Sequence, residues 1–214
     1  MLKKARFATG ELNRILFRNR AFDPIPFEPI QPEADLRRID CAPALSDPGM
    51  LERVVACGFK SDLERETAKL RATSWQETPT QRCELRDVLV LGGRILTRKA
   101  NHYAGPKSAH SALRAPVRSY TDETVPNTVQ GLMYFGHWLR DDCAAYELGR
   151  DMGRAIISLR RPSWSDCAAY EALFDQTWPE HAAPAAGALL LIPGTAVNLD
   201  KRRRLERLRA RVQA

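Results

Sequence analysis

The sequence has little that could build a metal or disulfide framework. No two of its cysteines form a Cys-x-x-Cys pair, and their number is odd and their spacing wide. Such spacing argues against a zinc cluster and favours free thiols in a reducing compartment. We therefore expect a cytoplasmic protein with neither metal nor cofactor of its own. The five cysteines are Cys41, Cys57, Cys83, Cys143 and Cys167.

Long apolar runs are also missing. The most apolar stretch, residues 188–193, is far shorter than the ~20 residues that a membrane helix needs. Residues 1–6 carry charges with no apolar stretch behind them, so we expect no export signal. Hydrophobic residues make up 44% of the chain and charged residues 28%, close to an ordinary soluble domain.

Glycine-rich phosphate loops are absent as well. The chain contains neither a Gly-x-Gly-x-x-Gly motif nor a Walker loop, so the usual nucleotide-phosphate cradle is not encoded. Its serines lack a nucleophile-elbow context, which argues against a serine hydrolase.

Much of the net charge of +7 lies near the C-terminus. Residues 201–211 hold seven Lys or Arg residues against Glu206, while Leu199, Leu205, Leu208 and Val212 recur at roughly helical spacing. This pattern predicts an amphipathic helix with a solvated basic face. The face could dock on an acidic partner, but without interleaved aromatics nucleic acid is a weaker candidate.

The first 84 residues predict an arm with short helices. Residues 23–32 contain four prolines and should be extended and irregular rather than helical. Residues 50–57, after the turn-forming Asp47-Pro-Gly, and residues 60–72 favour short helices.

From residue 85 onward the pattern predicts an α/β domain that extends to residue 214. Two aliphatic runs around Gly92-Gly93 indicate a β-hairpin. Residues 101–126, with His102 and His110, are rich in Ser, Ala, Pro and Gly and predict a long solvated loop. Strands then alternate with helices, which favours a Rossmann-like parallel sheet with flanking helices. The expected segments are a strand at 154–159, a helix at 166–174, a strand at 188–192 and a helix at 200–212, with Asn198 or Asp200 as its cap.

The most informative segment is Gly131-Leu-Met-Tyr-Phe-Gly-His-Trp-Leu-Arg-Asp-Asp142. If Gly136 marks the start of a helix, His137 and Asp141 lie one turn apart on the same face. A carboxylate in that position can fix the tautomer of the imidazole, which could then take a proton from a hydroxyl group. Trp138 offers a ring for stacking on a sugar, whereas Asp142 should face solvent or a neighbouring cation.

The segment resembles the acceptor-domain signature of glycosyltransferase family 61. Residues 137–141 reproduce His-Trp-Leu-Leu-Asp except that Arg140 replaces a leucine, and Tyr134 stands where many members have asparagine. The hairpin at 87–96 and the apolar strand with its basic helix after residue 189 are similar to neighbouring parts of that family. The resemblance covers about residues 85–212.

This resemblance implies an inverting sugar transferase without a metal, in polysaccharide or capsule biosynthesis. It further implies the N-terminal half of a GT-B architecture, whose second domain binds the nucleotide-sugar through a Gly-Ala-Gly-Leu-Thr-Asn-like segment. These 214 residues contain no such segment, so we expect no turnover by this chain alone. Three explanations stay open: a fragment of a longer protein, a subunit that pairs with a separate donor-binding domain, or a degenerate protein retained for binding. His137 and Asp141 are the catalytic candidates, and Trp138 and Asp142 the candidates for binding a glycan acceptor.

Two blander interpretations stay open. His137 could cap the helix start, with Trp138 and Leu139 in the core and both aspartates meeting the helix dipole. The chain could also be a non-catalytic α/β interaction module that docks through its basic C-terminal helix.

Overall fold

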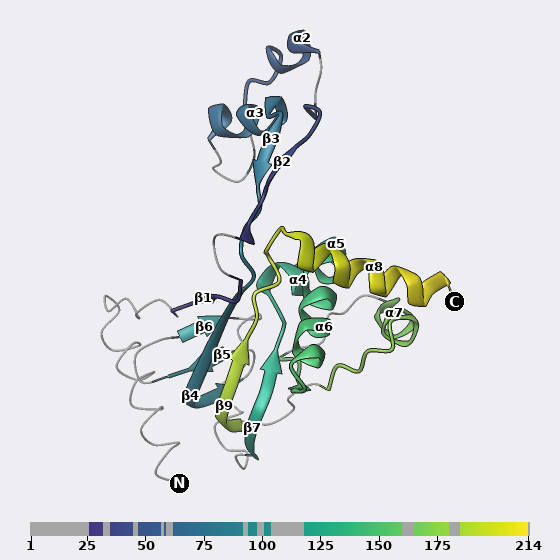
Figure 1. Ribbon diagram of the computed structural model, residues 1–214. Coiled ribbons are helices and arrows are strands. Elements are labelled where there is room, and N and C mark those ends of the chain that lie inside the picture. The colour runs from purple at the N-terminus through teal and green to yellow at the C-terminus, as the bar shows by residue number, and fades with distance from the viewer. Residues whose placement is uncertain are drawn as a thin grey trace, which may run out of the picture.

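The computed structural model describes residues 26–31, 35–44, 47–56, 58, 62–91, 94–97, 101–103, 118–159, 165–179 and 185–213. These residues form an α/β fold in which helices flank a mixed, partly parallel sheet (Figure 1). None of the helices in these ranges is both long enough and apolar enough to cross a membrane.

The sheet has the strand order β6-β5-β4-β9-β7-β8, and a short strand β1 pairs with the start of β4. β4 is antiparallel to both β5 and β9, whereas β7 is parallel to both β9 and β8. The strands are β1 (Glu28–Pro29), β4 (Gln81–Leu91), β5 (Arg94–Leu96), β6 (Asn101–Tyr103), β7 (Arg118–Val125), β8 (Ala155–Ile156) and β9 (Ala185–Leu191).

The structure confirms the expected hairpin and the alternation of strands and helices. Leu91 of β4 stands opposite Arg94 of β5 in an antiparallel ladder. The helix α7 (Cys167–Leu173) follows β8, and α8 (Leu199–Gln213) follows β9. The expected parallel sheet extends only over β7, β8 and β9, because β4 joins β9 from the other side in the antiparallel sense.

The prediction of a long loop over residues 101–126 is wrong at both ends of this range. Its first residues form β6, and residues 118–125 form β7, which lies between β9 and β8. Glu123 and Thr124 of β7 are buried, so this strand is largely polar despite its central position. Hydrogen bonding to two neighbouring strands stabilises it where no apolar run signals a strand. His110 lies outside the described residues.

The helices beside β7 and β9 are α4 (Val129–Met133), α5 (Phe135–His137), a π-helical turn η3 (Trp138–Asp142), α6 (Cys143–Asp151) and then α7 and α8. Figure 1 shows α6, α7 and α8 gathered on one side of the sheet. Ala145 of α6 packs against Leu190 and Ile192 at the end of β9. A second cluster, which includes Trp178 and Leu208, fills the space among these helices.

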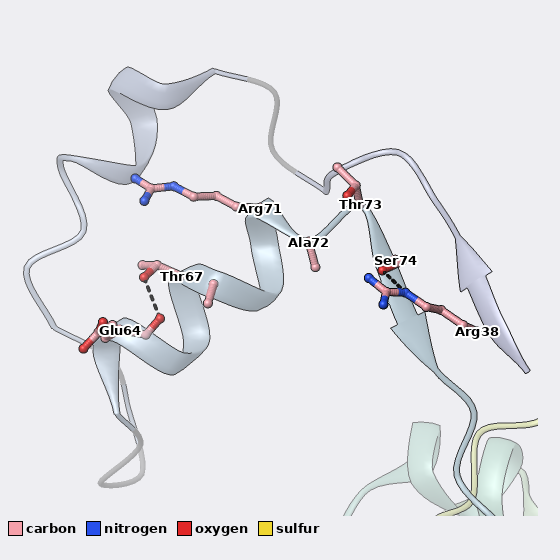
Figure 2. A pocket seen from close by; sticks show the side chains of 8 residues that line it. Arg38, Glu64, Thr67, Arg71, Ala72, Thr73 and Ser74 are labelled. Atoms are coloured by element: carbon pink, nitrogen blue, oxygen red, sulfur yellow. Dashed lines mark hydrogen bonds between the residues drawn. The ribbon is translucent and has the colours of Figure 1, made fainter. Parts of the chain in front are cut away.

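The expected N-terminal arm contains a small unit of paired strands and short helices. β2 (Arg38–Asp40) and β3 (Ser74–Gln76) pair antiparallel, and α2 (Pro48–Leu51) and α3 (Leu63–Arg71) lie between them in the chain. The unit projects away from the sheet (Figure 1), and an open hollow lies between α3 and β3 (Figure 2). The described part of the proline-rich segment is extended, as predicted, and pairs with β4.

Both short helices of this unit begin at an aspartate. Asp47 and Asp62 accept hydrogen bonds from backbone amides of the first helical turn, as N-cap residues do. The helices therefore start near the predicted places, but α2 ends at Leu51, well before the expected end at residue 57. The expected boundary between residues 84 and 85 lies within β4.

Candidate active site

The His137 segment begins with a short capped helix. The Thr128 hydroxyl accepts a hydrogen bond from the Gly131 amide at 2.9 Å, which starts α4. The helix is interrupted at Tyr134, which has extended backbone angles, and helical structure resumes at Phe135. This is one residue before the expected start at Gly136. The π-helical turn η3 follows directly and continues into α6. Single π turns of this kind are frequent at functional sites.

His137 and Asp141 share one face, as predicted. His137 Nδ1 lies 2.8 Å from Asp141 Oδ2, and the imidazole is 40% exposed while the carboxylate is 1% exposed. A charged carboxylate can only accept hydrogen bonds, so Nδ1 carries the proton of this contact. In the neutral ring Nε2 is then the nitrogen that can accept a proton.

Arg140 holds the same carboxylate from the exposed side. Its Nε donates to Asp141 Oδ1 and its Nη2 to Oδ2, both at 2.9 Å. A two-pronged guanidinium contact of this kind fixes the plane of the carboxylate. Arg140 therefore supports the His137–Asp141 pair.

Lys201 holds Asp141 from the buried side. Its ammonium donates to Asp141 Oδ1 and, at 2.6 Å, to the carbonyl oxygen of Gly194. The Lys201 side chain is only 7% exposed. Asn198 caps α8, as one of the two expected caps, by accepting a hydrogen bond from the Lys201 amide at 2.9 Å.

The ionisation of Asp141 follows from these contacts. Burial by itself raises the pKa of the carboxyl group. The hydrogen bonds from Arg140, Lys201 and His137 lower the pKa by a larger amount, so that it is about 2. Burial lowers the pKa of Lys201, and its contact with Asp141 opposes that shift. Asp141 is thus a carboxylate at neutral pH, fit to orient an imidazole and to stabilise the imidazolium that forms on protonation.

Gly194 lets the loop after β9 approach this pair closely. A Cβ at position 194 would lie 2.2 Å from the backbone oxygen of Asp141. Any larger residue would therefore push the loop away from η3 and displace the carbonyl that Lys201 contacts.

The expectation that Asp142 faces solvent or a cation is wrong. Its carboxyl group is fully buried and accepts hydrogen bonds from the Thr128 amide at 3.2 Å and from the Thr128 hydroxyl at 2.8 Å. Burial raises its pKa well above the usual value, and the Thr128 contacts only partly oppose this. Asp142 fastens α4 to η3 and is not exposed for contact with a glycan.

Trp138 is also buried, with none of its surface exposed. Its ring lies 6.0 Å from that of Phe135 and 6.3 Å from those of Tyr170 and Trp178. The stacking role expected for Trp138 is wrong in this structure, because both faces of a fully buried ring are covered by the protein. Its role is packing, as in the blander interpretation of the motif.

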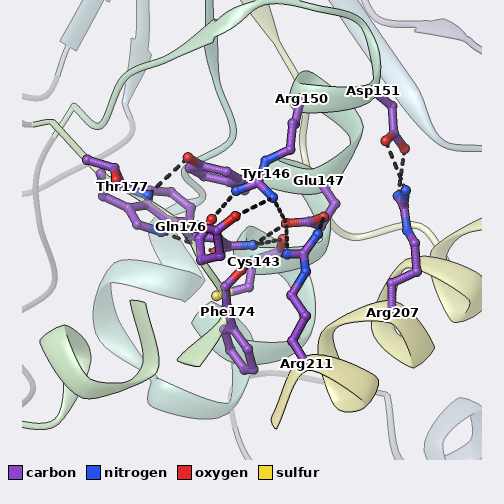
Figure 3. A network of polar contacts seen from close by, with 12 residues as sticks. Cys143, Tyr146, Glu147, Arg150, Asp151, Phe174, Gln176, Thr177, Arg207 and Arg211 are labelled. Carbon is purple, nitrogen blue, oxygen red and sulfur yellow. Dashed lines mark hydrogen bonds and ion pairs between the residues drawn. The ribbon is translucent and has the colours of Figure 1, made fainter. Parts of the chain in front are cut away.

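The basic face of α8 is not wholly solvated, contrary to prediction. Lys201 and Arg204 are buried, and Arg211 makes a bidentate ion pair with the fully buried Glu147 of α6 at 2.9 and 2.8 Å (Figure 3). Arg207 pairs with Asp151 in the same way from the next turn (Figure 3). These contacts fasten α8 to α6.

Sequence reasoning missed Lys201 as a site residue. Lys201, Arg204, Leu205 and Leu208 recur at spacings of three and four, and all except the partly buried Leu205 are buried. The row of α8 residues that faces the rest of the protein therefore begins with two basic residues, Lys201 and Arg204. Helical spacing could have placed Lys201 on the inner face, although nothing in the sequence names Asp141 as its partner.

No protein-family model matches this sequence, and neither a curated protein nor a solved structure is significantly similar to it. Among the described residues, no group of three or more His, Cys, Asp or Glu side chains could hold a metal ion. Four of the five cysteines lie in the described part of the chain, and none of these four forms a disulfide.

Proposed function

We propose that this chain is the acceptor-side domain of an inverting glycosyltransferase similar to family 61, acting in the cytoplasm on a polysaccharide or capsule glycan. The observation that carries the proposal is the half-exposed His137 with Nδ1 held at 2.8 Å by the buried carboxylate of Asp141. The Rossmann-like, GT-B interpretation of the α/β fold is part of the same proposal.

In this mechanism His137 is the general base. Its Nε2 takes the proton from an acceptor hydroxyl while that oxygen bonds to the anomeric carbon of the donor sugar from the face opposite the leaving group. The bond between the anomeric carbon and the phosphate oxygen breaks, and the nucleoside diphosphate leaves with the electron pair. Asp141 stabilises the imidazolium so formed, while Arg140 and Lys201 keep Asp141 in place.

The donor is a nucleotide-sugar, and we propose that a separate domain or subunit binds it. A GT-B enzyme works across the space between its halves, so the two halves must meet for the reaction to occur. His137 is half-exposed, and the segment that carries it contacts the residues after β7 and β9, Thr128 and Gly194. Ligands of open α/β sheets usually bind at such carboxyl ends of strands.

The alternative function, a non-catalytic module that docks through α8, has less support. Among the basic residues of α8, Arg204 is buried and Arg207 pairs with Asp151. Arg202 and Arg203 are well exposed, but each lies next to an acidic residue of α8 itself. Such pairing weakens the positive field that an acidic partner would meet.

A transfer assay tests the proposal. The chain is combined with a nucleotide-sugar-binding domain encoded beside it, and release of nucleoside diphosphate is followed for panels of nucleotide-sugars and glycans. We expect His137→Ala to lower the rate by about 10² to 10⁴-fold, the usual contribution of a general base. The exposed variant Arg202→Ala is the control and should keep its rate. Undiminished transfer by His137→Ala, with circular dichroism unchanged, would reject the role of His137.

A further inference from the structure

A cavity of about 250 Å³ opens at the carboxyl ends of β7 and β9. These strands are parallel neighbours, and Val125 stands opposite Leu191 at their last pair. The residues that follow each strand line the cavity, among them Thr128 after β7 and Thr195 after β9. Ligands of open α/β sheets bind outside the carboxyl ends of neighbouring parallel strands.

Two short links join this cavity to the His137–Asp141 pair. Thr128 lines the cavity and donates its hydroxyl hydrogen to Asp142, the residue next to Asp141. On the other side, Thr195 lines the cavity and follows Gly194, which lies against the backbone of Asp141. The cavity and the pair are therefore built on the same two segments.

The described lining residues are uncharged and of mixed polarity. Gln130 and Thr195 can exchange hydrogen bonds with hydroxyl groups, while Phe27 and Pro193 offer apolar surface. The described lining residues include no Lys, Arg, Asp or Glu. His102 also lines the cavity, and burial lowers its pKa, so the imidazole is neutral at pH 7.

This lining selects a class of ligand. Phosphates and carboxylates are bound most tightly by a cation, and the described lining residues include no Lys or Arg. A volume of about 250 Å³ is below the roughly 300–1,000 Å³ of sites for drug-sized ligands and suits a single ring. A sugar ring has both hydroxyl groups and apolar C–H faces, so it can contact both the polar and the apolar residues of the lining.

We propose that this cavity binds an uncharged sugar ring and, if the proposed function holds, that this ring belongs to the glycan acceptor. The ring lies against Phe27 and Pro193, and its hydroxyl groups bond to Gln130 and Thr195. The neighbouring sugar unit then extends over α4 toward His137.

Saturation-transfer NMR on the full chain tests this site with methyl glycosides of the common neutral pyranoses. We expect at least one to bind, and Thr195→Phe, which fills the cavity, to weaken it at least tenfold. Gln130→Ala on the exposed turn of α4 should weaken it about fivefold, the loss expected for one neutral hydrogen bond. Thr73→Phe is the matched control, because Thr73 is exposed and lines the unrelated hollow of Figure 2.

The charge of the probe gives a second test. Hexose 1-phosphate and hexuronic acids should bind at least tenfold more weakly than the matching neutral glycoside. Binding of no neutral pyranose, equal binding by both cavity variants and the wild type, or a preference for the charged sugars would each overturn the proposal.

The His137→Ala variant separates this inference from the proposed function. It removes the proposed base without filling the cavity, so its effects on sugar binding and on transfer can be compared with those of Thr195→Phe. If Thr195→Phe abolishes sugar binding but the chain never supports transfer, the cavity proposal is retained and the transferase proposal is rejected. If transfer requires His137 but Thr195→Phe leaves the KM for the acceptor unchanged, only the cavity proposal is rejected.

Discussion

The Lys201 ammonium donates a hydrogen bond to the buried carboxylate of Asp141, which lies 60 residues earlier in the chain. The same ammonium donates to the carbonyl oxygen of Gly194 at 2.6 Å. One side chain of α8 thus joins η3 to the loop after β9. The orientation of Asp141, and through it of His137, depends on the position of the C-terminal helix.

Lys201→Met tests this link. Removing one partner of a buried ion pair leaves the other charge poorly compensated, so we expect the free energy of unfolding to fall by about 3 kcal/mol. Arg202→Met is the control, since Arg202 is 75% exposed and pairs with Glu206 on its own helix. It should change stability by less than about 0.5 kcal/mol in urea unfolding. Equal stability of the two variants would contradict the assigned contact.

The pH dependence of stability tests the ionisation of Asp141. Its folded-state pKa of about 2 is below the ordinary 3.8, so the carboxylate stabilises the fold above about pH 4, and this contribution is lost as the pH falls toward 2. We expect the wild type to lose about 1–2 kcal/mol more than Asp141→Asn over this window, allowing for solvent screening. Parallel pH profiles of the two proteins in urea unfolding would reject the depressed pKa.

Asp142 should show the opposite sign. Burial raises its pKa in the folded state, so the folded protein retains a proton that the unfolded chain releases above about pH 4. The wild type should therefore lose stability relative to Asp142→Asn as the pH rises from 4 to 7. A stability difference that stays constant across this range would show that the carboxyl group ionises normally.

Gly131→Ala tests the packing of α4 on η3. A Cβ at this position would lie 2.0 Å from Asp142 Oδ2, so we expect a loss of about 2 kcal/mol from overpacking. Gly136→Ala is the matched control, because nothing lies within 4 Å of its added Cβ. Alanine favours helix over glycine, so Gly136→Ala should be neutral or stabilising by up to about 1 kcal/mol in denaturant unfolding. The reverse order of the two variants would contradict the described contact.

Arg211→Met tests the junction of α8 with α6. Arg211 pairs with Glu147, whose side chain is fully buried, so the variant should lose about 3–5 kcal/mol. Arg207→Met breaks an ion pair whose partners are 45% and 44% exposed and should cost less than about 1 kcal/mol. Thermal unfolding of both variants measures the difference. Similar melting temperatures would mean that Glu147 is compensated by its other partners, Gln176 and Arg150.

The features that the sequence predicts well rest on local periodicity. The hairpin of β4 and β5, the alternation of β8, α7, β9 and α8, and the shared face of His137 and Asp141 all involve residues close in the chain. The side-chain periods of strands and helices are properties of the backbone, so they can be followed before any tertiary contact is known.

β7 shows where local patterns fail. Residues 118–125 are mostly polar and follow a segment rich in loop formers, yet they form the strand between β9 and β8. The strand exists because its backbone hydrogen bonds are completed by two neighbours that come later in the chain. Strand preference depends strongly on such context.

The sequence by itself determined that this protein combines strands and helices and that an imidazole and a carboxylate meet one helical turn apart. Only the tertiary structure decided that Lys201 completes the pair, that Asp142 and Trp138 face inward, and that the cavity beside Thr195 adjoins them. Periodicity determines which residues share a face, because the helix and strand have fixed repeats. It does not determine which distant segment covers that face, since that depends on how the apolar surface of the whole chain is buried.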